Sequence, residues 1–387
     1  MNKKVAIFGS TGSIGINTLN IIRHSPNKFR IEVLLANSNV ELLAKQALEF
    51  QPSYVGIVDE TKLQQLKHYL DGHNIKIISG KNAAIELAKI KVDIAMMAIV
   101  GSSALAPTIT LIETGNNIAL ANKECLVCAG NIIMNMVTKF NIQMIPVDSE
   151  HNGLFQVFNY NQPSLVKDVT LTASGGPFRD YSLEQLHSVT KAQALKHPNW
   201  SMGAKISIDS ATLINKCLEV IEAYHLFPIT AKQINIVIHP ESIVHALATY
   251  RDGSILAQLS KPNMQIPISY ALHYPKRAQL DEFNQFNLAD IGKLHFYTPD
   301  HNRFKSLQIL DSVLQSINSN ASLLLNVANE IAVEAFLNDQ INFIQITQVI
   351  EQILNETEAT EPSSLSEILE HIELAKKRTL AYINKIS

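Results

Sequence analysis

The stretch Val5-Ala-Ile-Phe-Gly9-Ser-Thr-Gly12-Ser-Ile-Gly15 decides the fold of this chain. Its apolar residues predict a buried strand, its glycines predict a tight turn, and Ser13–His24 has the periodicity of a helix. Glycines at this spacing let the backbone approach a pyrophosphate, which the helix N-terminus then stabilises. A tight turn that binds nothing is the alternative, but the position directly after a first strand favours a dinucleotide site.

Apolar runs continue to alternate with helical patterns up to residue 148. The further predicted strands are Ile31–Ala36, Tyr54–Val58, Ile75–Ser79, Val92–Ile99, Asn117–Ala121 and Ile142–Val147. Continuous apolar strands separated by helices indicate a parallel sheet covered on both faces. Right-handed crossovers make such a sheet doubly wound. We therefore predict an α/β protein whose residues 1–148 form a Rossmann-like dinucleotide-binding domain.

The pattern changes after this domain. Strand signals persist among longer irregular segments, which predicts an α+β catalytic domain over residues 149–275. A segment rich in Pro, Asp, Asn and Phe predicts a linker over residues 276–302, and residues 303–387 predict a C-terminal helical bundle. The predicted strands of the second domain include Val169–Ala173, Ile234–His239 and Ile255–Leu259, and the predicted helices of the bundle are Phe304–Ser316, Ala321–Asn338, Ile344–Asn355 and Leu365–Ile386.

Bulk composition excludes several classes of protein. The 387 residues carry a formal net charge of -3, which gives no support to binding of nucleic acid or of an anionic membrane. No apolar run reaches the ~18 residues that span a bilayer, and the strand pattern starting at Lys4 leaves no room for a signal peptide. Three cysteines argue against a disulfide framework and fit a cytoplasmic protein. We interpret the redox-like spacing of Cys125 and Cys128 as coincidence.

The end of the second predicted strand bears on the choice of dinucleotide. An NAD site usually places an acid there for the ribose 2′-hydroxyl, but this strand ends in Ala36-Asn37-Ser38-Asn39. The missing carboxylate permits NADP, although no Arg or Lys stands at this turn either. The predicted cofactor-binding residues are Gly9, Ser10, Thr11, Gly12, Ser13, Ile14, Gly15, Ala36, Asn37, Ser38, Asn39, Asn122, Glu124 and Gly203.

A polar helix is predicted over Ser210–Glu222, with Asp209 and Ser210 at its N-cap. Asn215, Glu219 and Glu222 are three or four residues apart, so they project from one side, and Lys216 lies one step round. An amide, an ammonium and two carboxylates near a helix N-terminus suit a ligand with a phosphate and metal-binding oxygens.

A second acidic group follows the last strand of the first domain. In extended backbone, Asp148 and Glu150 face the same way, and a divalent cation relieves the repulsion between their carboxylates. With Glu219 they provide three oxygen ligands, which suits Mg²⁺ or Mn²⁺ and leaves positions open for substrate. The His and Cys ligands typical of zinc are missing. Capping carboxylates at a solvated loop end are the alternative.

Further candidates surround this group. Ser174-Gly-Gly supplies a hydroxyl and exposed amides, which with Ser210, Asn215 and Lys216 would hold a phosphate, although such a sequence alone is often only a turn. Trp200 lies between His197-Pro and Gly203, where a mobile lid or simply a packed loop is expected. Lys123 follows a predicted strand at the ligand edge of the sheet, so it is a candidate for contact with substrate or cofactor.

These motifs resemble those of the 1-deoxy-D-xylulose 5-phosphate reductoisomerases of the non-mevalonate isoprenoid pathway. The likeness covers nearly the whole chain and is carried by long segments in a fixed order. They are Gly-Ser-Thr-Gly-Ser-Ile-Gly (9–15), Ala-Asn-Lys-Glu (121–124), Pro-Val-Asp-Ser-Glu-His-Asn (146–152), Ser-Gly-Gly-Pro-Phe-Arg (174–179), His-Pro-Asn-Trp-Ser-Met-Gly (197–203), Asp-Ser-Ala-Thr (209–212) and Ala-Asn-Glu-Ile-Ala (328–332).

The resemblance implies a homodimeric, NADPH-dependent enzyme with one Mg²⁺ or Mn²⁺ per subunit. It would isomerise and reduce 1-deoxy-D-xylulose 5-phosphate to 2-C-methyl-D-erythritol 4-phosphate by retro-aldol and aldol steps followed by hydride transfer. Lys123, Ser149 and Glu150 would be catalytic, and the first two would lie beside the substrate's hydroxyl and carbonyl oxygens. The metal ligands would be Asp148, Glu150 and Glu219, and the other substrate residues would be Ser174, His197, Trp200, Ser210, Asn215 and Lys216.

Two positions depart from the family pattern. Members often carry Lys or Arg where this chain has Ser38, and Cys217 replaces a small residue beside Lys216, where a small apolar thiol should be tolerated. Two other functions remain open from the residues. A semialdehyde or sugar-acid dehydrogenase would share the glycine loop without needing the carboxylates, and a non-catalytic NADP(H) sensor would have no reason to keep them.

Overall fold

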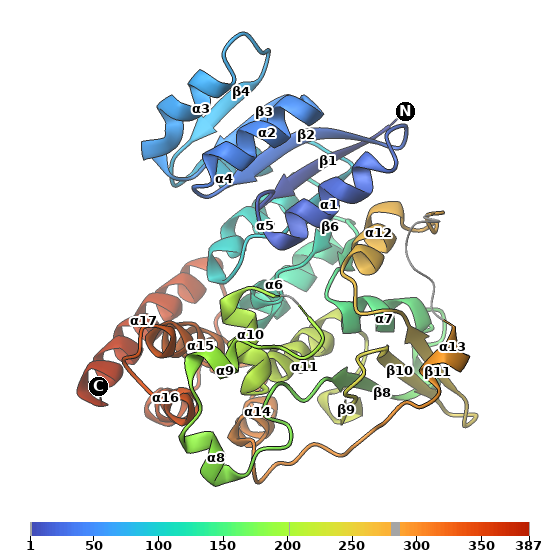
Figure 1. The fold of residues 1–387 in the computed structure, drawn as a ribbon, viewed down its shortest axis with the longest axis vertical. Coiled ribbons are helices and arrows are strands. Elements are labelled where there is room, and N and C mark those ends of the chain that lie inside the picture. Colours follow the sequence, from blue (N-terminus) through green and yellow to red (C-terminus); the bar gives the residue numbers. More distant parts are fainter. Residues whose placement is uncertain (1, 201, 280–286, 387) are drawn as a thin grey trace. The chain divides into compact units, whose positions relative to one another are not determined.

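A computed structural model describes residues 2–200, 202–279 and 287–386 of the chain (Figure 1). Ser201 of the predicted lid and residues 280–286 of the predicted linker lie outside the described residues. The chain divides into two compact units. The first comprises Met1–Cys125, Ile133–Phe155 and Asn263–Asn284, and the second comprises Leu126–Ile132, Gln156–Pro262 and Gln285–Ser387.

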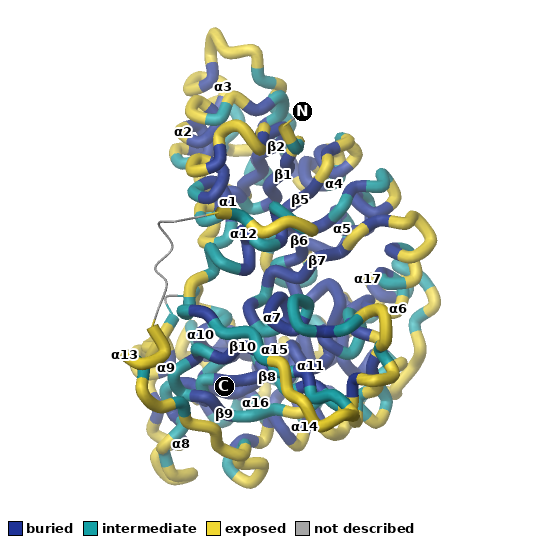
Figure 2. The backbone as a smooth tube through the Cα atoms, turned by 90° about the vertical axis from the view of Figure 1, so that its right-hand side faces the viewer, coloured by how far each residue is buried: buried dark blue, intermediate teal, exposed yellow. Residues whose placement is uncertain are grey.

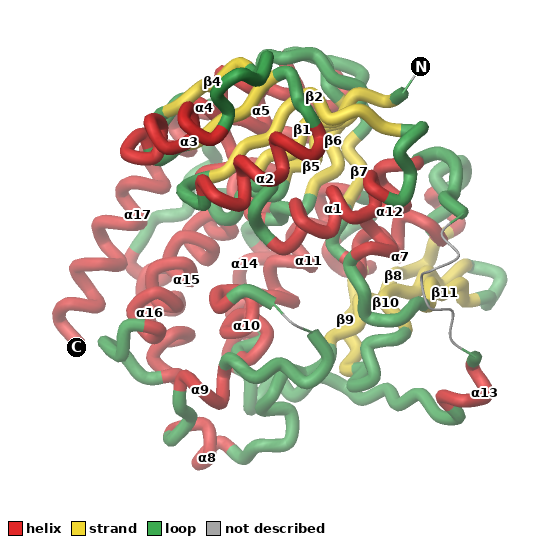
Figure 3. The backbone as a smooth tube through the Cα atoms, turned by 45° about the horizontal axis from the view of Figure 1, so that its top comes forward, coloured by secondary structure: helices red, strands yellow, loops and turns green. Residues whose placement is uncertain are grey.

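A seven-stranded parallel sheet forms the centre of the first unit (Figure 3). Its strands are β1 (Lys3–Phe8), β2 (Phe29–Ala36), β3 (Tyr54–Ile57), β4 (Lys76–Ser79), β5 (Ile94–Met97), β6 (Asn117–Leu120) and β7 (Met144–Pro146), in the order β4-β3-β2-β1-β5-β6-β7. The chain winds outward from β1 to one edge and then from β5 to the other. The order therefore reverses between β1 and β5, where doubly wound sheets bind ligands beyond the carboxyl ends of the strands.

Helices separate the strands of this sheet in sequence. They are α1 (Ser13–Arg23), α2 (Val40–Phe50), α3 (Leu63–Tyr69), α4 (Ala83–Ala88), α5 (Leu105–Glu113) and α6 (Glu124–Lys139), with 3₁₀ turns at Glu60–Lys62 and Ser102–Ala104. Two further helices, α7 (Ser149–Val157) and α12 (Gln265–His273), come after the last strand in sequence. Apolar strand residues such as Val5 and Ile7 are fully buried, as Figure 2 shows for the central strands. The core also includes Ile268 of α12, far along the sequence.

The second unit has a four-stranded mixed sheet. Its strands are β8 (Val166–Ala173), β9 (Ile234–Ile238), β10 (Val244–Tyr250) and β11 (Ile255–Leu259), in the order β11-β10-β8-β9. β10 pairs antiparallel with β8 and β11, whereas β8 and β9 are parallel. Ile255 and Leu256 of the edge strand β11 are exposed.

Helices supply the rest of the second unit. They are α8 (Leu183–His187), α9 (Lys191–Ala194), α10 (Ala204–Ala211), α11 (Ile214–Leu226), α13 (Leu288–Ile291), α14 (Lys305–Gln315), α15 (Ala321–Leu337), α16 (Phe343–Glu356) and α17 (Leu365–Ile386), with 3₁₀ turns at Pro163–Leu165 and Ala231–Gln233. α15 packs against α16 and α17 and buries most of its residues, so these helices form a bundle. The predicted fold class, with a Rossmann-like sheet, a second α+β region and helices at the C-terminus, is confirmed.

Two further findings concern membrane-spanning helices and the cysteines. Within the described ranges, no helix combines the length and the apolar character that a membrane crossing requires. Cys125, Cys128 and Cys217 are all buried and form no disulfide.

Candidate active site

The glycine loop between β1 and α1 has a backbone that only glycine fits at two positions. Gly9 has a φ of +91°, and a Cβ added to it would lie 2.6 Å from the carbonyl oxygen of Ala98. A Cβ on Gly15 would lie 2.4 Å from the carbonyl oxygen of Gly9. Both distances are far inside van der Waals contact, so any larger residue would open the loop.

The start of α1 leaves backbone donors open. Its N-cap residue is Gly12, which has no side chain to cap the first turn. Within the described ranges, the amides of Thr11, Ser13 and Ile14 donate to no protein acceptor. Open amides at a helix N-terminus, together with the helix dipole, suit a pyrophosphate.

The end of β2 presents neutral polar groups beside this loop. Asn37, Ser38 and Asn39 are exposed, and Ala36 is buried. The side-chain oxygen of Asn39 accepts a hydrogen bond from the amide of Leu42 at 3.2 Å and so caps α2. No charged residue stands at positions 36–39, as the sequence shows.

Asn122 braces the turn between β6 and α6. Its side-chain nitrogen donates to the carbonyl oxygen of Ile99 at 2.7 Å and of Gly101 at 3.0 Å. Its side-chain oxygen accepts from the amide of Cys125 at 2.8 Å. These contacts fix the segment that carries Lys123 and Glu124, which are both buried.

Asp148 and Glu150 stand at the start of α7 rather than on extended backbone as predicted. The amide of Asn152 donates to the carbonyl oxygen of Asp148 at 2.8 Å and closes the first helical turn. The expected extended backbone is therefore wrong, because Asp148 directly precedes the helix and Glu150 lies in its first turn. The expected proximity is present nevertheless, since one carboxylate oxygen of Asp148 and one of Glu150 lie within 4.8 Å of each other. Carboxylates remain favourable here because a helix N-terminus attracts negative charge.

Both carboxylates have polar partners within their own unit. The Lys123 ammonium forms an ion pair with Asp148, and both side chains are largely buried. The hydroxyl of Ser149 donates to Glu150 Oε2 at 2.5 Å. The three residues predicted to be catalytic, Lys123, Ser149 and Glu150, thus belong to the segments around β6, β7 and α7.

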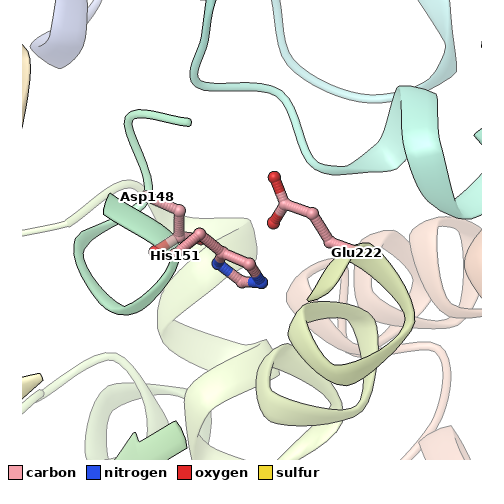
Figure 4. A group of neighbouring side chains, drawn as sticks. All are labelled: Asp148, His151 and Glu222. Carbon is pink, nitrogen blue, oxygen red and sulfur yellow. The ribbon is translucent and has the colours of Figure 1, made fainter. Parts of the chain in front are cut away.

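Two further side chains carry atoms of the kind that divalent ions bind. Figure 4 shows His151, beside Asp148 in the first turns of α7, and Glu222 on α11. Both are almost completely buried. From the sequence, Glu222 was predicted on the polar side of its helix, and His151 was given no role.

The predicted single helix over Ser210–Glu222 is wrong. α10 ends at Ala211 and α11 begins at Ile214, because Leu213 adopts the left-handed conformation with a φ of 61°. Ser210 consequently lies in the last turn of α10 and does not cap α11.

The first turns of α11 gather three polar side chains. Asn215 donates a hydrogen bond to one oxygen of Glu219, and the Lys216 ammonium forms an ion pair with the other. Lys216 is 3% exposed and Glu219 is 1% exposed. Burying a carboxylate is costly unless charge and hydrogen bonds compensate it, and both are supplied here.

The thiol of Cys217, the residue that departs from the family pattern, is directed at backbone carbonyl groups. Its thiol is fully buried and donates to the carbonyl oxygens of Leu213 at 3.3 Å and Ser306 at 3.2 Å. Burial raises the pKa of the Cys217 thiol well above its usual range. The group therefore stays protonated and unreactive.

The second unit brings together the predicted residues Ser174, His197 and Ser210. His197 Nδ1 accepts from the amide of Trp200 at 3.0 Å, so the ring proton lies on Nε2, which donates to the Ser174 hydroxyl at 3.0 Å. The amide of Gly176 also donates to this hydroxyl, at 3.1 Å. The Ser174 oxygen thus accepts two hydrogen bonds. A Cβ on Gly176 would lie 2.6 Å from the carbonyl oxygen of Ser210, which shows how closely these segments pack.

Trp200 contacts the second unit's sheet region. Its ring centroid lies 6.3 Å from that of His245, and the rings meet edge to face. Asn199 anchors the same segment, with its side-chain nitrogen 2.9 Å from the hydroxyl oxygen of Ser242. Gly203 precedes α10 as its N-cap residue.

A buried pair of side chains that the sequence did not reveal fixes the end of α10, which carries Ser210. Asn329 of α15 donates a hydrogen bond to Asp209 of α10 at 2.8 Å, and both side chains are at most 1% exposed. Lys205 forms an ion pair with the other Asp209 oxygen at 2.8 Å. The motif at residues 328–332 was the only sequence signal, and it carried no role.

A cavity of about 450 Å³ in the second unit lies behind the Ser174 loop, with Gly175 in its wall. Its two arginines are already neutralised, since Arg179 pairs with Asp180 at 2.8 Å and Arg303 with Asp300 at 3.5 Å. It contains none of the predicted substrate residues and offers no free charge for a phosphate.

Comparisons with known proteins assign the chain to the family that its sequence motifs resemble. Three family models match the chain: 1-deoxy-D-xylulose 5-phosphate reductoisomerase over residues 5–130, its C-terminal domain over residues 144–227, and the DXP reductoisomerase C-terminal domain over residues 259–378. The chain belongs to the 1-deoxy-D-xylulose 5-phosphate reductoisomerase family. The predicted family is therefore confirmed.

Relatives and solved structures extend this likeness over the full length. The reductoisomerase of Pelodictyon phaeoclathratiforme is 44% identical over 382 residues, which are 98% of this chain and 100% of that protein. A Wolbachia reductoisomerase is 45% identical over 95% of this chain and 94% of its own. The Zymomonas mobilis enzyme in complex with NADPH has a TM-score of 0.93 at 37% identity, covering 99% of both chains. A reductoisomerase in complex with NADPH, fosmidomycin and magnesium also has a TM-score of 0.93, at 38% identity over 99% of both chains.

Proposed function

We propose that this protein converts 1-deoxy-D-xylulose 5-phosphate to 2-C-methyl-D-erythritol 4-phosphate in isoprenoid biosynthesis, with NADPH and a divalent cation. Membership of the reductoisomerase family over nearly the whole chain is the observation that carries this proposal. The solved relatives hold NADPH, magnesium and fosmidomycin, which agrees with the predicted cofactors and with a small-molecule substrate.

NADPH would bind in the first unit, at the carboxyl edge of the seven-stranded sheet. The open amides after Gly9 suit its pyrophosphate. The adenosine ribose would lie beside residues 36–39, where the absence of a carboxylate avoids repulsion of the 2′-phosphate. Asn122 and Glu124 would border the same edge, and Gly203 would approach the cofactor from the second unit.

The divalent cation would be held by Asp148, Glu150 and Glu219. An all-carboxylate donor set suits Mg²⁺ or Mn²⁺. When bound, the cation supplies Lewis acidity and a template for the substrate's vicinal oxygens. Lys123 would hold the Asp148 carboxylate in place for the cation, and Lys216 would do the same for Glu219.

The substrate phosphate would bind to Ser174, His197, Ser210, Asn215 and Lys216. The Ser174 hydroxyl has its proton available for a phosphate oxygen, because its oxygen already accepts from His197 and Gly176. Holding the phosphate fixes the reacting carbons in place, so remote binding energy assists the chemical steps. Trp200 would exclude water as part of a lid.

Lys123 and Ser149 would act on the substrate's reacting oxygens. The Lys123 ammonium offers positive charge where a hydroxyl or carbonyl oxygen becomes negative. The Ser149 hydroxyl donates its proton to Glu150, so its oxygen can accept a hydrogen bond from a substrate hydroxyl.

Assembly and location complete the proposal. The exposed Ile255 and Leu256 lie on an open sheet edge, which a second copy of the chain would cover in a homodimer. Three buried cysteines that form no disulfide fit a cytoplasmic enzyme. The predicted domain limits after residues 148, 275 and 302 remain part of this proposal.

Oxidation of NADPH, followed by absorbance with 1-deoxy-D-xylulose 5-phosphate, tests the proposed function. We expect turnover with Mn²⁺ or Mg²⁺ and none after treatment with EDTA. Activity that survives EDTA would favour a dehydrogenase without metal. Tight NADPH binding without turnover of any ketose phosphate would favour a sensor.

A further inference from the structure

Gln46 is a buried amide on an otherwise apolar face of α2. It is 6% exposed and shares this face with Leu43, Ala44 and Ala47. Burying an amide among apolar side chains costs free energy that only hydrogen bonds return. A methionine would fill the same volume without that cost, so the amide needs an explanation in its contacts.

The amide makes its contact with the glycine loop. Gln46 Nε2 donates to the carbonyl oxygen of Ser10 at 2.9 Å, and Ser10 is fully buried. Among the described residues, Gln46 Oε1 has no partner. The amide orientation is nevertheless determined, because the opposite one would place two carbonyl oxygens against each other. Of the two polar atoms of the Gln46 amide, only the nitrogen therefore has a hydrogen-bond partner among the described residues, and that partner is a backbone carbonyl of the glycine loop.

This bond sets the orientation of one peptide plane. The bond between Ser10 and Thr11 is planar and trans, so its C=O and N–H point in opposite directions. With the Ser10 oxygen held toward Gln46, the Thr11 N–H must point away from α2. The amides of Gly9 and Ser10 both donate to the carbonyl oxygen of Leu35, at 2.9 and 2.8 Å, and so fix the preceding part of the loop.

We propose that Gln46 is a positioning residue that holds the Ser10–Thr11 peptide with its N–H directed at the NADPH pyrophosphate. The inference rests on the proposed binding of NADPH to the glycine loop. Without the Gln46 donor, the Ser10 carbonyl is buried and unpaired, and this peptide can rotate to find another partner. The Thr11 donor then has to be reoriented before the cofactor binds, which lowers affinity.

The test compares Gln46→Met with the parent protein. Met has nearly the same length and no donor, and its apolar burial offsets the lost hydrogen bond, so we expect a thermal midpoint within a few degrees of the parent. We expect the Kd for NADPH alone, measured by its fluorescence, to rise about tenfold, the value of one net hydrogen bond. The KM for the sugar phosphate at saturating NADPH should not change. Gln51→Met, at the exposed C-terminal end of α2, is the matched control and should leave the Kd unchanged.

Two outcomes would overturn the inference. One is an unchanged Kd for NADPH in Gln46→Met. The other is equal loss of affinity for NADPH and for the sugar phosphate together with a large fall in the thermal midpoint, which would mark a purely structural role. Gly15→Val separates this inference from the proposed function. If Gly15→Val abolishes NADPH binding and Gln46→Met does not weaken it, only the inference about Gln46 fails. If Gly15→Val binds NADPH normally, the loop site itself fails.

Discussion

Lys216 and Glu219 form an ion pair within one turn of α11, with 3% and 1% of their side chains exposed. Asn215 donates to the other oxygen of the same carboxylate. One helix thus carries a positive and a negative side chain that hold each other in place. Exclusion of water strengthens both interactions.

Replacing Lys216 by Met should weaken binding of the substrate phosphate. The loss of a charge-assisted hydrogen bond predicts about 1.5–3 kcal/mol, seen as a higher KM and a lower kcat/KM. Steady-state kinetics with 1-deoxy-D-xylulose 5-phosphate measure this, and the thermal midpoint reports the cost of leaving Glu219 without its ion pair. Lys167→Met, at an exposed position on β8, is the control. Unchanged KM and kcat would remove Lys216 from the site.

Replacing Ser174 by Ala should have a narrower effect. It removes the hydroxyl that His197 and Gly176 orient, so we expect a KM for the sugar phosphate about tenfold higher. The Kd for NADPH should stay the same, because the loss is confined to the second unit. Ser188→Ala, at an exposed position after α8, serves as the control. A defect in NADPH binding equal to that in substrate binding would contradict the proposed role.

Replacing Asn329 by Ala should destabilise the protein. It removes the buried hydrogen bond to Asp209, which predicts a free energy of unfolding lower by about 1.5–3 kcal/mol. Urea denaturation measures the change. Asn338→Ala removes an exposed amide at the end of the same helix and should cost much less. Equal effects of the two substitutions would show that the Asp209 contact contributes nothing.

His225 should make stability depend on pH. Burial lowers its pKa to about 4, whereas the unfolded chain titrates near the ordinary value of about 6.5. Between these two values the unfolded chain binds a proton that the folded chain does not, so the free energy of unfolding falls as the pH falls. The contribution is complete above about pH 6.5 and amounts to about 3 kcal/mol.

His225→Gln tests this assignment. Urea denaturation at about pH 7 and about pH 4.5 should show a smaller loss of stability for the variant than for the parent. His73→Gln, at an exposed position, should keep the parent's dependence. The assignment is wrong if His225→Gln retains the full loss on acidification.

The sequence predicted each strand of the parallel sheet because the strands are continuous apolar runs, although β5 is Ile94–Met97 where Val92–Ile99 was expected. Tyr54–Val58, for example, was expected as a strand and is β3, Tyr54–Ile57. The C-terminal helices were equally clear, since their apolar residues recur at helical spacing. The sequence did not predict that α12 packs into the core of the first unit, because contacts between segments far apart in the chain leave no local pattern.

Local backbone conformation limited the prediction of the site. The left-handed Leu213 divides a segment whose side-chain spacing reads as one helix, and leucine gives no turn signal. Asp148–Glu150 follows a strand and was taken as extended, whereas it begins a helix. The side chains of Asn215, Lys216 and Glu219 were still predicted to lie together, because their spacing lies within α11.

Titration of the protein with Mn²⁺ by calorimetry tests the central claim most directly, namely that Asp148, Glu150 and Glu219 hold one divalent cation. The parent should bind one Mn²⁺ per chain, and Glu219→Gln should lose that binding along with metal-dependent oxidation of NADPH. Binding of one Mn²⁺ with unchanged affinity by Glu219→Gln, with full turnover at ordinary metal concentration, would contradict the account.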